Sequence, residues 1–214
     1  ARFKVGWSRC SPLNAALCAT TNLKVGMINQ LKNKLKQLAL LNAIIEPEWE
    51  YRYFSYNSEW SGDEEMASLR DSCGGEWFIW FSGDLVGFKC TSPVDGLVDE
   101  FQQLLQAFPQ CYSEFVREPA FTMQTGSTAW YLHLDSWVKF GFDINDLPTP
   151  ETILKMSASD FCAFADSTYE VELSQQIVQS FFDGEFNVES AIKLNPEVEV
   201  SELLAELPQL GICT

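Results

Sequence analysis

His133 is the single histidine of the chain, and it limits the catalysis that the sequence can support. One imidazole provides no two-histidine metal site, and neither H-E-x-x-H nor a Cys/His zinc spacing occurs. A catalytic triad would have to combine His133 and Asp135, two residues apart on one strand face, with a nucleophile. Cys73, before Gly74-Gly75, is the most nucleophile-like thiol, but no family signature surrounds it. A strand histidine with satisfied hydrogen bonds and a turn cysteine are therefore the favoured interpretation.

Two groups of carboxylates lie near aromatic residues, as the carboxylates of glycosidase clefts do. They are Asp63-Glu64-Glu65 and the alternating Glu46, Glu48 and Glu50. A glycosidase needs two carboxyl groups at a defined separation inside a cleft, and a chain with 30 acidic residues contains such groups by chance. An enzyme of unknown reaction that uses carboxylates or Cys73 therefore remains the alternative hypothesis. We assign no catalytic residue, no cofactor and no metal ligand.

The densest feature of the chain is the segment from Trp49 to Trp60, in which six of twelve residues are aromatic. Most aromatic side chains belong to cores, but Tyr and Trp are also enriched at the centres of protein interfaces. An acidic turn follows directly. We therefore predict a binding surface with aromatic anchors and an acidic rim that steers the partner. Its residues are Tyr53, Tyr56, Trp60, Asp63, Glu64 and Glu65.

The formal net charge of −16 restricts the partners that the protein can attract. Residues 140–214 contain fourteen acidic side chains against only Lys155 and Lys193. Such a surface repels nucleic acid and anionic membrane and attracts a basic protein, although solubility is the simplest reason for it. Neither a P-loop nor a G-x-G-x-x-G motif occurs. We expect a basic protein partner, no nucleic acid and no membrane.

Cysteine usage and hydropathy indicate a cytoplasmic protein. The seven cysteines are scattered, their number is odd, and no C-x-x-C pair occurs. This pattern suits a reducing compartment, where cysteine acts as a small apolar residue. No apolar run approaches the roughly 20 residues of a membrane span.

The first 26 residues differ from the rest because they carry four basic and no acidic side chains and show no clear period. We predict that 1–26 is a non-native or disordered extension and that the first patterned helix opens at Met27. Residues 27–214 would then form a single α+β domain, with 140–214 as its helical, acidic part.

The elements that must position these residues follow from apolar spacing. Ile28, Leu31, Leu35, Leu38 and Ile45 indicate an amphipathic helix that ends before Pro47. Strands are predicted at 49–58, 64–70, 76–81 and 85–89, then a helix near 95–108 and a strand pair at 118–123 and 128–134. Residues 76–81 are aromatic on both faces, which indicates a central strand.

Helix-start signals dominate the last third of the chain. Thr149-Pro150-Glu151, Ser159-Asp160 and Ser174 each open a predicted helix, and two short helices follow near 188–194 and 196–207. The predicted fold class is α+β: an antiparallel sheet of about five or six strands packed by helices, with a C-terminal helical segment.

The runs Trp49–Trp60, Glu65–Asp71 and Gly87-Phe88-Lys89 resemble those of a group of bacterial proteins of unknown function. The resemblance covers about Met27 to Cys213. It implies a cytoplasmic bacterial protein and brings no activity or catalytic residue with it. The order of helix and sheet is also loosely similar to small immunity proteins that neutralise toxins.

Our leading hypothesis is a non-enzymatic, acidic protein-binding module of the bacterial cytoplasm, immunity-like in the sense that its partner could be a toxin domain. The enzyme described above is one alternative. A binder of a small apolar molecule, held among Trp77, Trp80 and a helix, is the other.

Overall fold

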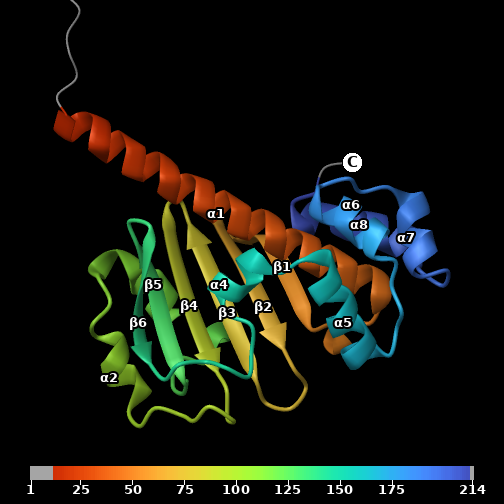
Figure 1. Ribbon diagram of the computed structural model, residues 1–214. Coiled ribbons are helices and arrows are strands. Elements are labelled where there is room, and N and C mark those ends of the chain that lie inside the picture. The colour runs from red at the N-terminus through yellow and green to blue at the C-terminus, as the bar shows by residue number, and fades with distance from the viewer. Residues whose placement is uncertain (1–11, 213–214) are drawn as a thin grey trace, which may run out of the picture.

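A six-stranded antiparallel sheet, with the strands side by side in chain order, forms the centre of the protein (Figure 1). The computed structural model describes the backbone of residues 12–212 and the side chains of residues 24–212. The strands are β1 (Phe54–Ser61), β2 (Glu64–Arg70), β3 (Glu76–Ser82), β4 (Leu85–Thr91), β5 (Thr128–His133) and β6 (Ser136–Gly141). The predicted α+β class is confirmed, because helices cover this sheet and a helical segment ends the chain.

Helix α1 (Pro12–Ile45) crosses one face of the sheet, and its first turns extend beyond the sheet (Figure 1). The predicted apolar stripe is buried at Ile28, Leu31, Leu35 and Leu38. The helix begins at Pro12 rather than near Met27. Residues 13–23 lack charge and are rich in alanine and leucine, so helix propensity favours this start although no stripe is visible. Residues 1–11 of the predicted extension lie outside the described residues.

The aromatic strand is shorter than predicted. A 3₁₀ turn occupies Trp49–Tyr51, and β1 begins only at Phe54. The side chain of Arg52 holds the preceding backbone in this turn by donating hydrogen bonds to the carbonyls of Glu46 and Pro47. As a consequence Trp49 and Tyr51 are exposed rather than part of a pleated face.

The central position of β3 is confirmed, and its two faces belong to two different cores. Trp77 and Phe81 pack beneath α1 and the C-terminal helices, whereas Phe78 and Trp80 pack beneath the segment that joins β4 to β5. That segment contains α2 (Phe101–Leu105), α3 (Ser113–Arg117) and 3₁₀ turns at Gln110–Tyr112 and Pro119–Phe121. The predicted helix near 95–108 is thus reduced to five residues.

The predicted strand at 118–123 is wrong. Glu118 caps the turn Pro119–Phe121 by accepting a hydrogen bond from the Ala120 N–H, and Phe121 is fully buried in the second core. Proline lacks the N–H that a strand would use, so a capped turn is favoured here. The hairpin partner of β5 is β6, which the two-residue turn Leu134-Asp135 joins to it.

Five further helices pack into the same core as α1. They are α4 (Pro150–Lys155), α5 (Ala158–Tyr169), α6 (Gln175–Phe182), α7 (Val188–Leu194) and α8 (Val200–Leu210). The predicted cap Thr149 is confirmed and forms a capping box with Thr152. Helix α5 is capped by Ser157, two residues before the predicted start, and α8 begins at Val200 rather than near 196. Within the described residues, no helix has both the length and the apolarity that crossing a membrane requires.

Candidate functional site

A groove of about 620 Å³ lies between the C-terminal end of α1 and helix α8. One wall comes from the α1 end and the turn that follows it, and the other from α8 and the residues before it. The lining residues are Ala43, Pro47, Trp49, Arg52, Val198, Glu199, Glu202, Leu203, Ala205, Glu206 and Gln209. The groove therefore joins two segments that are about 150 residues apart in the chain.

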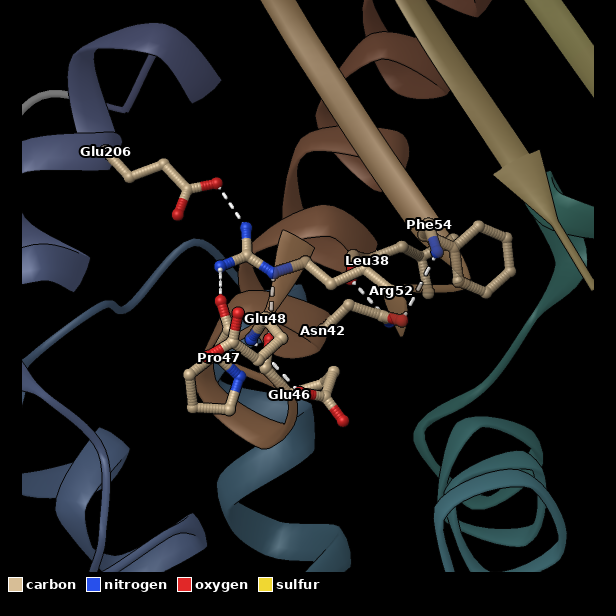
Figure 2. A network of polar contacts seen from close by, with 8 residues as sticks. All are labelled: Leu38, Asn42, Glu46, Pro47, Glu48, Arg52, Phe54 and Glu206. Carbon is tan, nitrogen blue, oxygen red and sulfur yellow. Dashed lines mark hydrogen bonds and ion pairs between the residues drawn. The ribbon is translucent and has the colours of Figure 1, made fainter. Parts of the chain in front are cut away.

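Arg52 connects the two walls (Figure 2). Its Nε donates to the carbonyl oxygen of Glu46 and its Nη2 to that of Pro47, both at 2.8 Å, and its Nη1 pairs with the carboxylate of Glu206 on α8. Only 7% of the Arg52 side chain is exposed, against 24% for Glu206. A planar guanidinium can serve three acceptors in different directions, which a lysine ammonium on a flexible stem does less well.

Asn42, also labelled in Figure 2, fixes α1 to the sheet. Its Nδ2 donates to the carbonyl of Leu38 at 3.0 Å, and its Oδ1 accepts from the Phe54 N–H at 3.2 Å and from the Tyr169 hydroxyl at 2.7 Å. The Tyr169 hydroxyl in turn accepts from the Tyr53 N–H at 2.8 Å. The wall that carries Arg52 is thus attached to α1, β1 and α5 at once, and the groove is built on a fixed base.

The acidic wall comes from the spacing of α8. Glu199, Glu202 and Glu206 lie at i, i+3 and i+7 on one side, while Leu203, Leu207 and Leu210 are buried. Glu199 and Glu202 are exposed, and within residues 24–212 no lysine or arginine pairs with either of them. Arg52 neutralises Glu206, so the groove keeps two free negative charges.

Trp49 forms the aromatic part of the groove and is 55% exposed. The guanidinium of Arg70 lies 5.2 Å from the centre of its ring, a cation–π contact within the chain. An exposed tryptophan next to unpaired carboxylates can bind a cationic side chain by stacking and by charge together.

Tyr56 and Glu65, two residues of the predicted surface, face α1 instead of solvent. Tyr56 is buried, and its hydroxyl donates to the Glu65 carboxylate at 2.6 Å. Lys32 and Lys36 of α1 pair with the same carboxylate at 2.5 and 3.1 Å. Burial alone would raise the pKa of Glu65, but the hydrogen bonds from Lys32, Tyr56 and Lys36 hold this pKa below its usual value. The cluster fastens α1 to the sheet.

The other four predicted residues do not join Tyr56 and Glu65. Tyr53 is half-buried, with its ring 4.7 Å from that of Phe164, and burial raises its pKa to about 12. Trp60 packs on the opposite face of the sheet, stacked on Phe121 at 6.0 Å. Asp63 is exposed in the β1–β2 turn, and Glu64 is half-buried beside it. The six residues therefore do not form one surface, and their role in binding stays a prediction.

The residues of the enzyme hypothesis are also separated. Cys73 follows the end of β2 and His133 ends β5, and these strands run in opposite directions, so the two residues lie at opposite ends of the sheet. Glu46 accepts a hydrogen bond from the Glu48 N–H at 3.0 Å and so shapes the turn after α1. The described residues contain no group of three or more His, Cys, Asp and Glu that could hold a metal ion.

The place proposed for a small apolar ligand is filled by the protein itself. Trp77 and Trp80 are 0% and 2% exposed, and they point to opposite faces of β3. Both rings are surrounded by core side chains, among them Phe54 and Phe88 around Trp77 and Tyr112 and Phe115 around Trp80.

Sequence reasoning missed the groove. The spacing of Glu199, Glu202 and Glu206 against the leucines of α8 is visible in the sequence, but nothing local indicates that Trp49 lies opposite them. Comparisons with protein-family models, with curated proteins and with solved structures gave no match. The geometry of the chain is therefore the basis for any functional conclusion.

Proposed function

We propose that this protein is a non-enzymatic binding module of the bacterial cytoplasm, and that the groove between α1 and α8 receives a basic segment of a partner protein. The observation that carries the proposal is the exposed Trp49 opposite the two unpaired carboxylates Glu199 and Glu202. Neutralisation of a toxin domain by an immunity-like protein is one biological form of such binding.

The shape of the groove supports a side chain or short segment as the ligand. Its volume of about 620 Å³ lies in the range of ordinary ligand pockets, and its base is fixed by Arg52 and Asn42. A fixed base reduces the ordering cost of binding. The buried Val198 and Leu203 provide an apolar floor for the stem of a lysine or arginine, and the carboxylates receive its charged end.

The charge of the whole chain supports a basic partner over a nucleic acid or an anionic membrane. At a formal net charge of −16 the long-range field attracts cationic proteins and repels phosphates. The free carboxylates of the groove then act at short range, where an arginine can also stack on Trp49.

The test is calorimetric titration of the protein with a short arginine–glycine repeat peptide at low and at moderate salt. We expect binding that weakens as salt rises, because exposed charges are screened. The double variant Glu199→Gln/Glu202→Gln removes the two free charges. Exposed ion pairs contribute about 0.2–1 kcal/mol each, so the affinity should fall about two- to thirtyfold.

The matched control is Glu172→Gln/Glu185→Gln, which makes the same change of net charge at two exposed glutamates outside the groove. The control should retain most of the affinity, and Trp49→Ala should lose at least as much as the groove variant. If the two double variants weaken binding equally, the peptide responds only to the net charge of the protein, and the groove assignment is wrong.

A further inference from the structure

The two edges of the sheet are treated differently by the fold. Along β1 the end of α8 lies close: the Ser58 hydroxyl donates to the Pro208 carbonyl at 3.1 Å, and a Cβ on Gly211 would stand 2.9 Å from the Ser58 Cβ. Strand β6, the last strand at the other edge, pairs with β5. An edge strand with unpaired backbone groups is a template for another strand, and proteins usually block it.

The hydrogen-bond pattern shows which backbone groups of β6 are free. His133 pairs with Ser136 across the two-residue turn, and the Phe142 N–H donates to the Ser127 carbonyl at 2.9 Å. In an antiparallel ladder, residues whose N–H and C=O bond the partner strand alternate with residues whose N–H and C=O point outward. Because Ser136 and Phe142 bond the inner side, Val138 faces β5, while Trp137 and Lys139 direct their backbone groups away from the sheet. Among the described residues, no hydrogen bond reaches these outward groups.

The side chains do little to block this edge. Lys139 is the one charged residue of β6, and it is neutralised by Glu151 at 2.6 Å. The large apolar side chains of Leu134 and Phe142, at the two ends of the strand, are 51% and 47% exposed. No proline interrupts the strand.

We propose that β6 pairs antiparallel with β6 of a second copy of this chain, about a two-fold axis at Val138. The register is chosen by self-complementarity. With Val138 opposite Val138, Lys139 lies beside the second copy's Trp137, and Leu134 lies opposite the second copy's Phe142. The exposed Leu134 and Phe142 at the two ends are thereby brought toward each other, and the two Lys139 side chains, each held in its own chain by Glu151 and over the Trp130 ring, are not direct neighbours.

A pairing centred on Lys139 is worse on the same grounds, because it would place the two ammonium groups directly opposite each other. The chosen register gives hydrogen bonds between Trp137 and Lys139 in both directions and joins the two sheets into one continuous sheet. A symmetric contact of this kind closes as a dimer and does not continue into a fibre.

The first test compares Lys139→Pro with Lys139→Ala by sedimentation equilibrium of the full chain over a wide concentration range. Both variants lose the ammonium group, but only proline removes the outward N–H, and an edge strand tolerates it there. The alanine variant should form dimers, and the proline variant should dissociate at about tenfold higher concentration or more, because two symmetric hydrogen bonds are lost. A wild type that stays monomeric, or equal dissociation of both variants, overturns the proposal.

The second test fixes the register with cysteine. Directly opposed residues of a non-hydrogen-bonded pair have Cα atoms about 4.5 Å apart, within the range of about 4.4–6.8 Å that a disulfide between two Val138→Cys chains requires. Ser136→Cys lies on the same strand face, but its partner in this register is Phe140 of the second copy. Peptide mass analysis after mild oxidation should find the 138–138 disulfide and no 136–136 disulfide. The reverse result, or equal yields, contradicts the proposed axis.

Discussion

Replacing Arg52 by methionine should destabilise the protein strongly, although the residue lies in the short connection between α1 and β1. The substitution keeps much of the apolar stem but removes three hydrogen-bonding groups. The carbonyls of Glu46 and Pro47 lose their donors, and Glu206 loses its counter-charge. The 3₁₀ turn that carries Trp49 then loses the side chain that holds the backbone before it.

The size of the effect follows from the burial of the pair. Breaking a buried ion pair by removing one partner costs about 3–5 kcal/mol. Since 24% of the Glu206 side chain is exposed and can regain water, the lower end applies, about 3 kcal/mol. Glu206→Gln keeps an acceptor for the guanidinium and should cost about 1 kcal/mol.

Urea unfolding at 25 °C measures this directly. With a slope of about 2 kcal/mol per molar urea, the midpoint of Arg52→Met should fall by about 1.5 M. Arg70→Met is the control, because Arg70 is exposed and its loss should change the free energy of unfolding by only about 0.5 kcal/mol. If Arg52→Met unfolds within about 0.5 kcal/mol of the wild type, the role given to the Arg52 network is refuted.

Four further predictions concern other parts of the fold. The pKa of Glu65 is lowered in the folded state. The stability that the ionised Glu65 contributes is therefore complete above its unfolded pKa of about 4.3, and it declines as pH falls through the folded pKa. The urea midpoints of the wild type and of Glu65→Gln should differ at pH 7 and converge in acid. Tyr56→Phe should lower the free energy of unfolding by about 1 kcal/mol in the same assay. An unchanged midpoint would show that the 2.6 Å hydrogen bond from Tyr56 to Glu65 contributes no stability. Thr149→Ala removes a capping box and should cost about 1 kcal/mol, whereas Thr149→Ser should restore most of it. Burial raises the pKa of the Cys90 thiol to about 12, so iodoacetamide should label the exposed Cys73 long before Cys90, as peptide mass mapping would show.

The parts of the fold that follow a strict period could be predicted from the sequence. Leu31, Leu35 and Leu38 lie on one buried side of α1, and Trp77 and Trp80 occupy opposite faces of a central strand, as their spacing indicates. The caps at Thr149 and Ser174 also mark real helix starts. In each case the signal lies within a few residues of the element it predicts.

The parts that depend on contacts between distant residues could not be predicted. Trp49 lies outside β1 because Arg52 binds the carbonyls of Glu46 and Pro47, which precede Trp49, and also Glu206, which is distant in the chain. Tyr56 and Glu65, predicted as exposed binding residues, are instead partners of the α1 lysines. Composition shows that the chain is rich in aromatic and acidic residues, but tertiary packing decides which of them are exposed.

The most direct measurement of the central claim is ¹⁹F NMR of the protein labelled with 5-fluorotryptophan and titrated with the arginine–glycine peptide. Trp49→Phe assigns the resonance of Trp49, the exposed tryptophan of the groove. The account predicts that this resonance shifts with saturation, that those of Trp77 and Trp80 do not move, and that Glu199→Gln/Glu202→Gln weakens the shift. An unmoved Trp49 resonance under conditions where the peptide binds would contradict the groove as the binding site.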